Sequence, residues 1–229
     1  MDSKKNAERI RAWIAAGVEI RDENSVYIDD GVQIAAGAVI WPNNHLYGNT
    51  SVAAGAVIGP NNVIYDSAIG ENCNVLASVL KGAKLGRNVS VGPNAYLREN
   101  SSIGDDCRVG DFVEIKNAVI GAGTKIAHLT YIGDADVGKN CNFGCGVVFA
   151  NYDGKNKYRT TVGDECFIGS NCNLVAPLNV ESGAFVAAGT TVTREVKKET
   201  FVIGRVKQQE SETLKQRFIP WRKKGEKHA

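Results

Sequence analysis

A branched aliphatic residue recurs at every sixth position over much of this chain, and this period constrains the fold more than any other feature. One register runs from Ile28 to Ile64, and it returns from Leu85 to Ile115 and from Val162 to Val192. Neither the period of an α-helix nor the alternation of a single strand gives a six-residue repeat. A solenoid of short strands and tight turns does, because each unit of six forms one flat side of a coil.

The composition agrees with a narrow interior that bends every few residues. The 229 residues include 25 glycines and only 7% aromatic residues, and the continuous repeat favours one elongated body. The net charge of +2 gives no general case for binding nucleic acid or membranes. No apolar run approaches the roughly 20 residues of a membrane span, and the first residues lack a signal-peptide core. We therefore expect a cytoplasmic protein.

The repeat predicts three segments. These are an N-terminal helix and lead-in over residues 1–25, a solenoid over 26–196, and a C-terminal arm with a basic tail over 197–229. Within the arm we expect a short helix over 211–217, followed by the basic residues of the tail at 221–224. Residues 6–16 have an apolar helical face that needs a partner, either the first coil or another subunit. At about 18 residues per three-sided coil, the solenoid should contain about nine coils.

The period fails once inside the solenoid, at residues 150–161. This stretch is polar, carries three cations and has a turn signal at Asp153-Gly154. We expect a loop ejected from the coil here, and ligand binding is the usual reason for such a loop.

Five of the six cysteines are predicted to be core residues. Each follows a branched aliphatic residue by four positions, where the repeat elsewhere has Ala, Ser or Thr; they are Cys73, Cys107, Cys141, Cys166 and Cys172. A thiol in this slot behaves as a compact apolar group, and disulfides are rare in reducing cytosol. Cys145 alone departs from the pattern.

His128 is the strongest catalytic candidate among the three histidines. His45 is expected at a turn and His228 lies in the tail, so both are expected to be solvated. His128, in contrast, lies near Glu114 and several cations once the coils stack. Three chemistries compete for this cluster. A zinc site would need three histidines, and a Cys145 nucleophile would give a covalent acyl-enzyme. In direct acyl transfer, His128 would be the general base and Glu114 would orient its ring.

Several motifs resemble the acetyltransferase domain of bifunctional glucosamine-1-phosphate acetyltransferase/N-acetylglucosamine-1-phosphate uridyltransferase, a hexapeptide-repeat acyltransferase. The motifs are Arg98, Phe-Val-Glu114-Ile-Lys116, His128-Leu-Thr-Tyr131-Ile-Gly-Asp, Asn142-Phe-Gly-Cys145-Gly, Asn151-Tyr152-Asp-Gly, Leu174-Val-Ala-Pro and Ala187-Ala188-Gly-Thr-Thr-Val-Thr. The resemblance implies an all-β solenoid, specifically a left-handed parallel β-helix with a short N-terminal helix and a C-terminal arm. General chirality rules alone would favour right-handed crossovers.

The resemblance also implies a reaction and its residues. Acetyl would pass from acetyl-CoA to the amine of glucosamine 1-phosphate in a homotrimer with sites between subunits. This reaction belongs to the synthesis of UDP-N-acetylglucosamine, a cell-wall precursor, and acetyl transfer itself needs no metal. The implied catalytic residues are His128, Glu114 and Asn151. The implied sugar-phosphate contacts are Arg98, Lys116, Tyr131, Asn142, Tyr152 and Lys157. The implied acetyl-CoA contacts are Cys145, Ser170, Ala188 and Arg205.

Two departures from the family pattern affect these expectations. No glycine-rich UTP-binding motif occurs in this chain, so uridyl transfer is not expected from it and a separate nucleotidyltransferase could supply that step. Ser211 stands where the family often has lysine in its CoA-binding arm. Two other interpretations remain open. One is an acyltransferase for a different amino sugar or nucleotide sugar, and the other is a non-catalytic trimeric scaffold.

Overall fold

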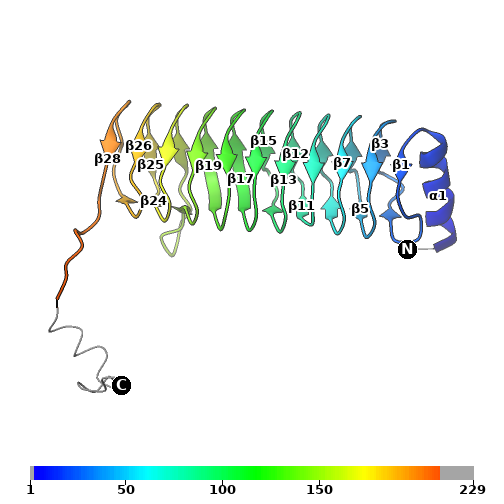
Figure 1. Ribbon diagram of the computed structural model, residues 1–229, viewed down its shortest axis with the longest axis horizontal. Coiled ribbons are helices and arrows are strands. Elements are labelled where there is room, and N and C mark those ends of the chain that lie inside the picture. The colour runs from blue at the N-terminus through cyan, green and yellow to red at the C-terminus, as the bar shows by residue number, and fades with distance from the viewer. Residues whose placement is uncertain (1–2, 212–229) are drawn as a thin grey trace, which may run out of the picture.

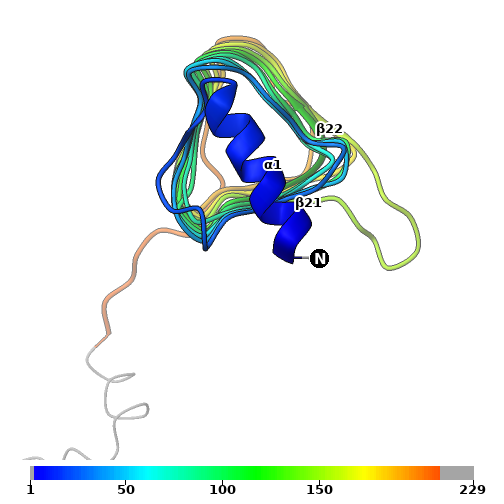
Figure 2. The same cartoon turned by 90° about the vertical axis from the view of Figure 1, so that its right-hand side faces the viewer.

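In the computed structural model, which describes residues 3–211, short strands wind into a three-sided solenoid that begins behind a single helix (Figure 1). Figure 2 shows the triangular cross-section from the N-terminal end. In that view the chain runs anticlockwise as it recedes, from β21 (Val148–Ala150) through the ejected loop to β22 (Thr160–Val162). The solenoid is therefore a left-handed parallel β-helix, as predicted.

Each side of the prism is a parallel sheet built from one short strand per coil. The first face has 11 strands, in the order β1 (Glu19–Ile20), β4 (Val39–Ile40), β7 (Val57–Ile58), β10 (Asn74–Val75), β13 (Ser90–Val91), β16 (Arg108–Val109), β18 (Lys125–Ile126), β20 (Asn142–Phe143), β23 (Phe167–Ile168), β26 (Phe185–Val186) and β28 (Phe201–Val202). These strands bound about 10 turns. The expectation was about nine turns over 26–196, and β1 and β28 lie outside that range.

The other two faces form one continuous 17-stranded sheet, because β17 (Glu114–Ile120) and β19 (Tyr131–Val137) bend around the corner between them. The second face contains β2 (Tyr27–Ile28), β5 (His45–Tyr47), β8 (Val63–Tyr65), β11 (Val79–Lys81), β14 (Tyr96–Leu97), the first halves of β17 and β19, β21, β24 (Asn173–Val175) and β27 (Thr191–Val192). The third face contains β3 (Gln33–Ile34), β6 (Ser51–Val52), β9 (Ala68–Ile69), β12 (Lys84–Leu85), β15 (Ser102–Ile103), the second halves of β17 and β19, β22 and β25 (Leu178–Val180).

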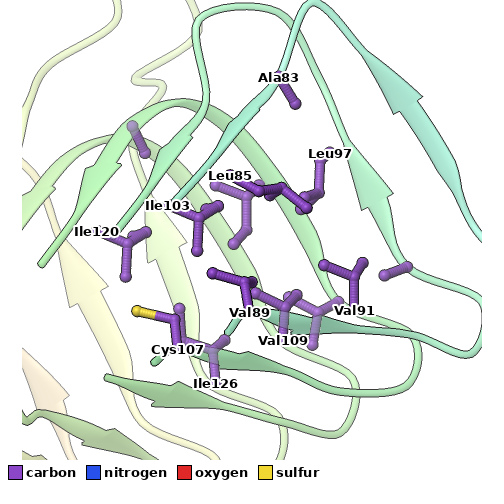
Figure 3. Close-up of a cluster of buried hydrophobic side chains, with 14 of the residues drawn as sticks. Ala83, Leu85, Val89, Val91, Leu97, Ile103, Cys107, Val109, Ile120 and Ile126 are labelled. Carbon is purple, nitrogen blue, oxygen red and sulfur yellow. The ribbon is translucent and has the colours of Figure 1, made fainter. Parts of the chain in front are cut away.

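The interior is lined by the residues that the six-residue period predicted. All branched aliphatic residues of the three registers are buried, and so are the five periodic cysteines. In Figure 3 the side chains of Leu85, Val91, Leu97 and Ile103 converge on the axis, with Cys107 among them. Burial raises the pKa of the Cys107 thiol, which keeps it protonated and suits its role as a core residue.

The five-residue steps in the repeat become sharp corners between the second and third faces. At two of them Asn117 and Asp134 adopt the left-handed backbone region, with φ of 47° and 51°. Asn and Asp tolerate this region better than most residues. A five-residue step uses one residue fewer per coil than a six-residue step. Glu114 therefore pairs with Tyr131, which is 17 residues later in the sequence instead of 18.

The N-terminal helix α1 (Ser3–Ala15) covers the open end of the first coil. Ile10, on the inner face of the helix, is fully buried. Asn6 Nδ2 donates to Val26 O at 2.9 Å, and Asn6 Oδ1 accepts from Ile28 N at 3.1 Å. The partner that the apolar helical face required is thus the first coil.

His45 is better packed than its sequence position indicated. It lies in β5, where its ring stacks on Tyr27 with 4.7 Å between centroids. Its Nδ1 is 2.9 Å from the Tyr47 hydroxyl. The prediction of a solvated turn residue was wrong because cross-strand neighbours on the outer surface of a sheet can stack their rings.

At the other end, regular structure ends with β28, and the arm continues as irregular chain to Ser211. The helix expected over 211–217 lies outside the described residues except for its first position. The basic tail at 221–224 and His228 also lie outside them. Across residues 3–211, no helix is long and apolar enough to cross a membrane.

Truncation of Phe149 should show how strongly the core stabilises the coil. Phe149 is fully buried in β21 and lies 5.8 Å from Phe143 between ring centroids. We expect Phe149→Ala to lower the free energy of unfolding by about 3–5 kcal/mol because it leaves a cavity. The melting temperature, measured by circular dichroism, should fall by about 6–20 °C.

Phe167 provides a matched control on the outside of the same solenoid, where it is 39% exposed and stacks on Phe185. Phe167→Ala should cost only about 1 kcal/mol. Equal destabilisation by the two variants would contradict the assignment of inner and outer positions.

Candidate active site

One corner of the prism, between the first and second faces, carries a vertical column of five residues, four of which were predicted as site residues. We call Asp111, His128, Cys145, Ser170 and Ala188 the corner column. The carbonyl oxygens of its first four members each accept a hydrogen bond from the next coil. The donors are the N–H groups of Leu129, Gly146, Asn171 and Gly189, at 3.2, 2.9, 2.8 and 2.8 Å. These bonds fix the column at the spacing of neighbouring strands, about 4.8 Å per coil.

The column ends at Arg205 in the C-terminal arm. Arg205 Nη1 donates to the carbonyl of Ala188 at 2.6 Å, so a side chain continues the hydrogen-bond pattern of the corner. Beside the column, on the outer surface of the first face, Phe167, Phe185 and Phe201 form a ladder with centroid distances of 4.6 and 5.5 Å. All three rings are exposed. The column is therefore flanked by an apolar wall and ends at a cation.

His128 presents its imidazole to the outside of the corner. His128 and Leu129 both adopt the left-handed backbone region, with φ of 61° and 57°, and the His128 side chain is 56% exposed. Two consecutive residues in this region are unfavourable for non-glycine residues, and such conformations concentrate at functional sites. His128 Nδ1 lies 2.6 Å from Asp111 Oδ1 in the preceding coil. When Nδ1 carries the proton, Nε2 is left as a free acceptor.

A group of basic side chains lies at the opposite edge of the second face. We call Arg98, Lys116 and Lys157 the cation cluster. Arg98 Nη1 donates to Glu114 Oε1 at 2.8 Å, and this carboxylate raises the pKa of Arg98. Arg98 Nε is buried and has no hydrogen-bond partner in the described part of the chain. The nearby Lys157 ammonium lowers the pKa of Lys116. Two cations held together with an unused guanidinium donor form a place for an anion.

A buried carboxylate organises the corner next to the cation cluster. Asp134 Oδ1 accepts from Asn117 Nδ2 at 2.6 Å, and Asp134 Oδ2 accepts from Asn151 Nδ2. Asp134 and Asn151 are only 8% and 7% exposed. The amide of Asn151 is therefore held in one orientation at the point where the loop leaves the coil.

Gly133 makes room for two predicted site residues, the sugar contact Tyr131 and the catalytic residue Asn151. A Cβ on Gly133 would collide with the Tyr131 hydroxyl and would lie 2.9 Å from Asn151 Nδ2. The backbone of Gly133 is not in the left-handed region, so glycine is required here for space. Tyr131 and Asn151 thus both lie against the bare Cα of Gly133.

The ejected loop is ordered from within and fixed at its base. Tyr152 and Lys157 form an antiparallel bridge, and Asp153 Oδ1 accepts from the N–H groups of Lys155 and Asn156 at 2.7 and 2.6 Å. Arg159 anchors the returning limb with bonds of 2.5 and 2.6 Å to Asp136. The loop therefore projects Lys157 from a fixed base at the corner that is visible in Figure 2.

The two groups share the second face but occupy opposite edges of it. Asn142 belongs to neither group, since it lies on the first face in register with Lys125 and Phe167. In a single subunit the corner column and the cation cluster lie at opposite ends of the short strands that cross the second face. Neither group alone contains both a base and an anion site.

Comparison with known proteins agrees with this architecture. The family model described as GMPPB C-terminal domain matches residues 82–206, which include every predicted site residue from Arg98 to Arg205. The chain belongs to this family.

Sequence comparison shows which members of this family the chain is similar to. The chain is 49% identical over 192 residues to "Bifunctional protein GlmU" of Clostridium beijerinckii and 50% identical over 202 residues to the protein of the same name from Clostridium perfringens. These alignments cover 84% and 88% of this chain, but only 42% and 44% of the relatives. This member of the GMPPB C-terminal domain family is thus homologous to the C-terminal part of GlmU and has the hexapeptide acyltransferase fold.

A solved structure independently supports the fold. A UDP-N-acetylglucosamine acyltransferase from Campylobacter jejuni is similar with a TM-score of 0.51 and 15% identity, over 80% of this chain and 70% of that one. At 15% identity, this similarity shows only that the two proteins share the solenoid fold.

Most predicted site residues of this family member fall into the two groups. The column contains His128, Cys145, Ser170 and Ala188, and it ends at Arg205. The cation cluster and its surroundings contain Arg98, Glu114, Lys116, Tyr131, Asn151, Tyr152 and Lys157. Cys145 is half-buried, unlike the other five cysteines.

One predicted contact is absent and needs correction. Glu114 does not hold the His128 ring in this subunit, because Glu114 pairs with Arg98 and the His128 ring is held by Asp111. The coil length gives the reason. Asp111 lies 17 residues before His128 and stacks directly on it, whereas Glu114 stacks on Tyr131. Counting coils of 17 residues instead of 18 would have found Asp111 in the sequence.

Sequence reasoning also missed the residues that position the site. Gly133 and Asp134 end the motif that begins at His128, and Arg159 is one of the three loop cations, but their positioning roles follow only from contacts across a corner. Among residues 3–211, no three His, Cys, Asp or Glu side chains converge as a metal site would require.

Proposed function

We propose that this chain transfers acetyl from acetyl-CoA to the amine of glucosamine 1-phosphate. One observation carries the proposal: the corner column stacks the candidate base, His128, directly above the residues that the resemblance assigns to the acetyl donor. An extended thioester arm would lie along this column with its acetyl end near His128 and its phosphates near Arg205. The GlmU relatives, which share about half of the aligned residues, support the same choice.

The cation cluster supports a phosphorylated acceptor. A phosphate dianion would relieve the repulsion between Lys116 and Lys157, and it could also take the unused donor of Arg98. Arginine binds phosphate in two-pronged fashion, which a surface lysine cannot imitate. Tyr131, Asn142 and Tyr152 would contact the sugar, and Asn151 would orient the amine.

The reaction then needs only a base and a donor for the developing oxyanion. His128 Nε2 would take a proton from the acceptor nitrogen as that nitrogen attacks the thioester carbon. The carbon–sulfur bond breaks, and the departing thiolate receives the proton back from the imidazolium. An amide and free CoA result.

The N–H of Cys145 is the best candidate to stabilise the oxyanion. The neighbouring Gly146 N–H is occupied, since it donates to the His128 carbonyl at 2.9 Å. The Cys145 N–H donates to no acceptor within residues 3–211. A fixed, unused backbone donor beside the base is the arrangement that acyl transfer requires.

The separation of the two groups supports a site completed by a second subunit. We propose a homotrimer in which the column of one protomer faces the cation cluster of its neighbour. The product would be a precursor of UDP-N-acetylglucosamine, made in the cytoplasm, with uridyl transfer supplied by a nucleotidyltransferase domain or partner.

The test is release of CoA thiol from acetyl-CoA, measured with a panel of amino sugars with and without a 1-phosphate. We expect turnover of glucosamine 1-phosphate and little turnover of glucosamine. Preference for another amino or nucleotide sugar would replace the acceptor, and no turnover with any amine would favour the scaffold alternative. Sedimentation analysis tests the trimer.

Lys157→Gln should weaken phosphate binding without lowering stability. Losing one charged hydrogen bond to phosphate should raise KM for glucosamine 1-phosphate about 10-fold. Lys157 depresses the pKa of Lys116 in the folded protein. Between this depressed pKa and 10.5, the unfolded chain therefore binds more protons than the folded chain does. The free energy of unfolding of the wild type should rise as the pH rises through this range. The melting temperature of the variant should therefore equal or slightly exceed that of the wild type at pH 7, and this difference should shrink by pH 10.

Lys155→Gln is the matched control, because Lys155 belongs to the same exposed loop and causes no shift at Lys116. Inorganic phosphate should raise the melting temperature of wild type and Lys155→Gln more than that of Lys157→Gln. Equal responses in all three proteins would remove Lys157 from the phosphate site.

Cys145→Ala should retain most of the activity. Our mechanism uses the backbone N–H of Cys145 and not its thiol, and in residues 3–211 the His128 ring pairs with Asp111 and makes no hydrogen bond to Cys145. Steady-state kcat measures the outcome. Loss of activity by 10²-fold or more, or an acetylated Cys145 seen by mass spectrometry, would restore the covalent alternative.

A further inference from the structure

We propose that Asp111 is the positioning residue for His128, a role that the family resemblance gave to Glu114. The inference rests on the proposed function for its chemistry, but its geometry is independent of any substrate. Asp111 Oδ1 and His128 Nδ1 are 2.6 Å apart. The Asp111 side chain is only 33% exposed, against 56% for His128.

The backbone holds this pair in register at a second point. The Asp111 carbonyl accepts a hydrogen bond from Leu129 N at 3.2 Å, directly after His128. The strands that enter the corner are paired as well, with Val109 opposite Ile126. Asp111 and His128 are therefore joined by one side-chain contact, and backbone pairing holds the two coils in register on both sides of it. The contact between the Asp111 carboxylate and the His128 ring therefore does not depend only on the rotamer of one surface side chain.

Glu114 is committed elsewhere in the same subunit. It lies in β17, where its strand neighbours are Tyr96 and Tyr131. Its Oε1 accepts from Arg98 Nη1 at 2.8 Å. To reach His128, Glu114 would have to abandon Arg98 and leave that guanidinium unpaired beside Lys116. Asp111 reaches His128 without breaking any contact.

The chemical consequence is control of the histidine tautomer. A carboxylate that accepts from Nδ1–H keeps the proton on that nitrogen and leaves the Nε2 lone pair for the amine. The same charge stabilises the imidazolium that forms when His128 takes the proton. Glu114, by contrast, orients Arg98. Asp111 therefore acts on the base, and Glu114 acts on a residue that would bind the phosphate.

Nitrogen-15 NMR of the histidine rings tests the pairing without any substrate. The chain has three histidines, so the His128 signals are assigned by comparison with His128→Asn. In the wild type we expect the neutral ring to carry its proton on Nδ1. In Asp111→Ala it should revert to Nε2–H, the form that a neutral imidazole prefers in water, whereas in Glu114→Gln it should remain Nδ1–H. Reversal in Glu114→Gln but not in Asp111→Ala, or the same tautomer in all three proteins, would overturn the proposal.

Kinetics on the same variants separate the two roles. Asp111→Ala should lower kcat for acetyl transfer about 10²-fold with unchanged KM values, and Asp111→Asn should be intermediate because it keeps the acceptor but not the charge. Glu114→Gln should act mainly on KM for the sugar phosphate. If the chain transfers no acetyl group at all, the NMR result still decides the pairing. Circular dichroism melting curves verify that each variant folds. A lower kcat in Asp111→Ala with an unchanged tautomer would show a merely structural role.

Discussion

Replacement of His128 by Asn should lower kcat for acetyl transfer by about 10²–10⁴-fold, which is the contribution expected of a well-placed general base. Asn is preferable to Ala at this position because the residue has φ of 61°, and Asn tolerates that region. The side chain is 56% exposed, so little packing is lost and the melting temperature should hardly change. Stopped assays of CoA thiol release measure kcat, and calorimetry measures stability.

His45→Gln is the control for this experiment. His45 stacks on Tyr27 and lies against the tilted ring of Tyr47, far from the corner column, so its loss should affect stability and leave kcat unchanged. An activity of His128→Asn within tenfold of the wild type would show that another group removes the proton, and the mechanism would have to be rebuilt around it.

Gly133→Ala should lower kcat/KM for glucosamine 1-phosphate by about 10²-fold. The added methyl group would displace the Tyr131 hydroxyl and press on the Asn151 amide. A displacement of about 1 Å in groups that position the reactants is enough for a loss of this size. Because Gly133 is not in the left-handed region, the methyl group itself, and not backbone strain, would cause the effect. Binding of acetyl-CoA, measured by calorimetry, should be unchanged.

A second substitution tests this steric explanation. Tyr131→Phe removes the atom nearest to the new methyl group, so Gly133→Ala combined with Tyr131→Phe should recover part of the activity relative to Gly133→Ala alone. Gly59→Ala is the control, since a Cβ there meets Leu76 Cδ1 and the Val75 carbonyl oxygen, both at 3.1 Å, in a part of the solenoid without predicted site residues. Similar losses in Gly59→Ala would point to a general destabilisation of the coil.

The fold could be predicted closely because one geometric rule governs it throughout. A buried aliphatic residue every six positions fixes which side chains point inward, as Ile58, Leu97 and Val186 do. The same rule found the small inward slots of the cysteines and the one interruption that becomes the loop. It erred for His45, because the outer surface of a sheet carries no periodic constraint and neighbouring rings can stack there.

The candidate site could be predicted as a set of residues but not as a set of contacts. His128, Lys116 and Lys157 stood out by chemistry and resemblance, and the structure places each of them at an edge of the second face. Their partners were harder to find. Asp134 and Arg159 act across a corner between neighbouring coils, and the five-residue steps that create such corners shift the vertical register by one residue.

The sequence by itself determined the three-sided coil, its inward residues and the segment that leaves it, since all of these depend on local periodicity. Only the tertiary structure decided which carboxylate meets the imidazole. Asp111 and Glu114 are three residues apart, and the spacing of residues along the chain allows either of them to be the partner of His128. The left-handed turn at His128 directs its ring toward Asp111, while Arg98 holds Glu114 at the other edge of the face. Which carboxylate contacts His128 depends on the backbone direction at the corner and on competition between ion pairs. Neither can be predicted from the spacing of residues along the chain.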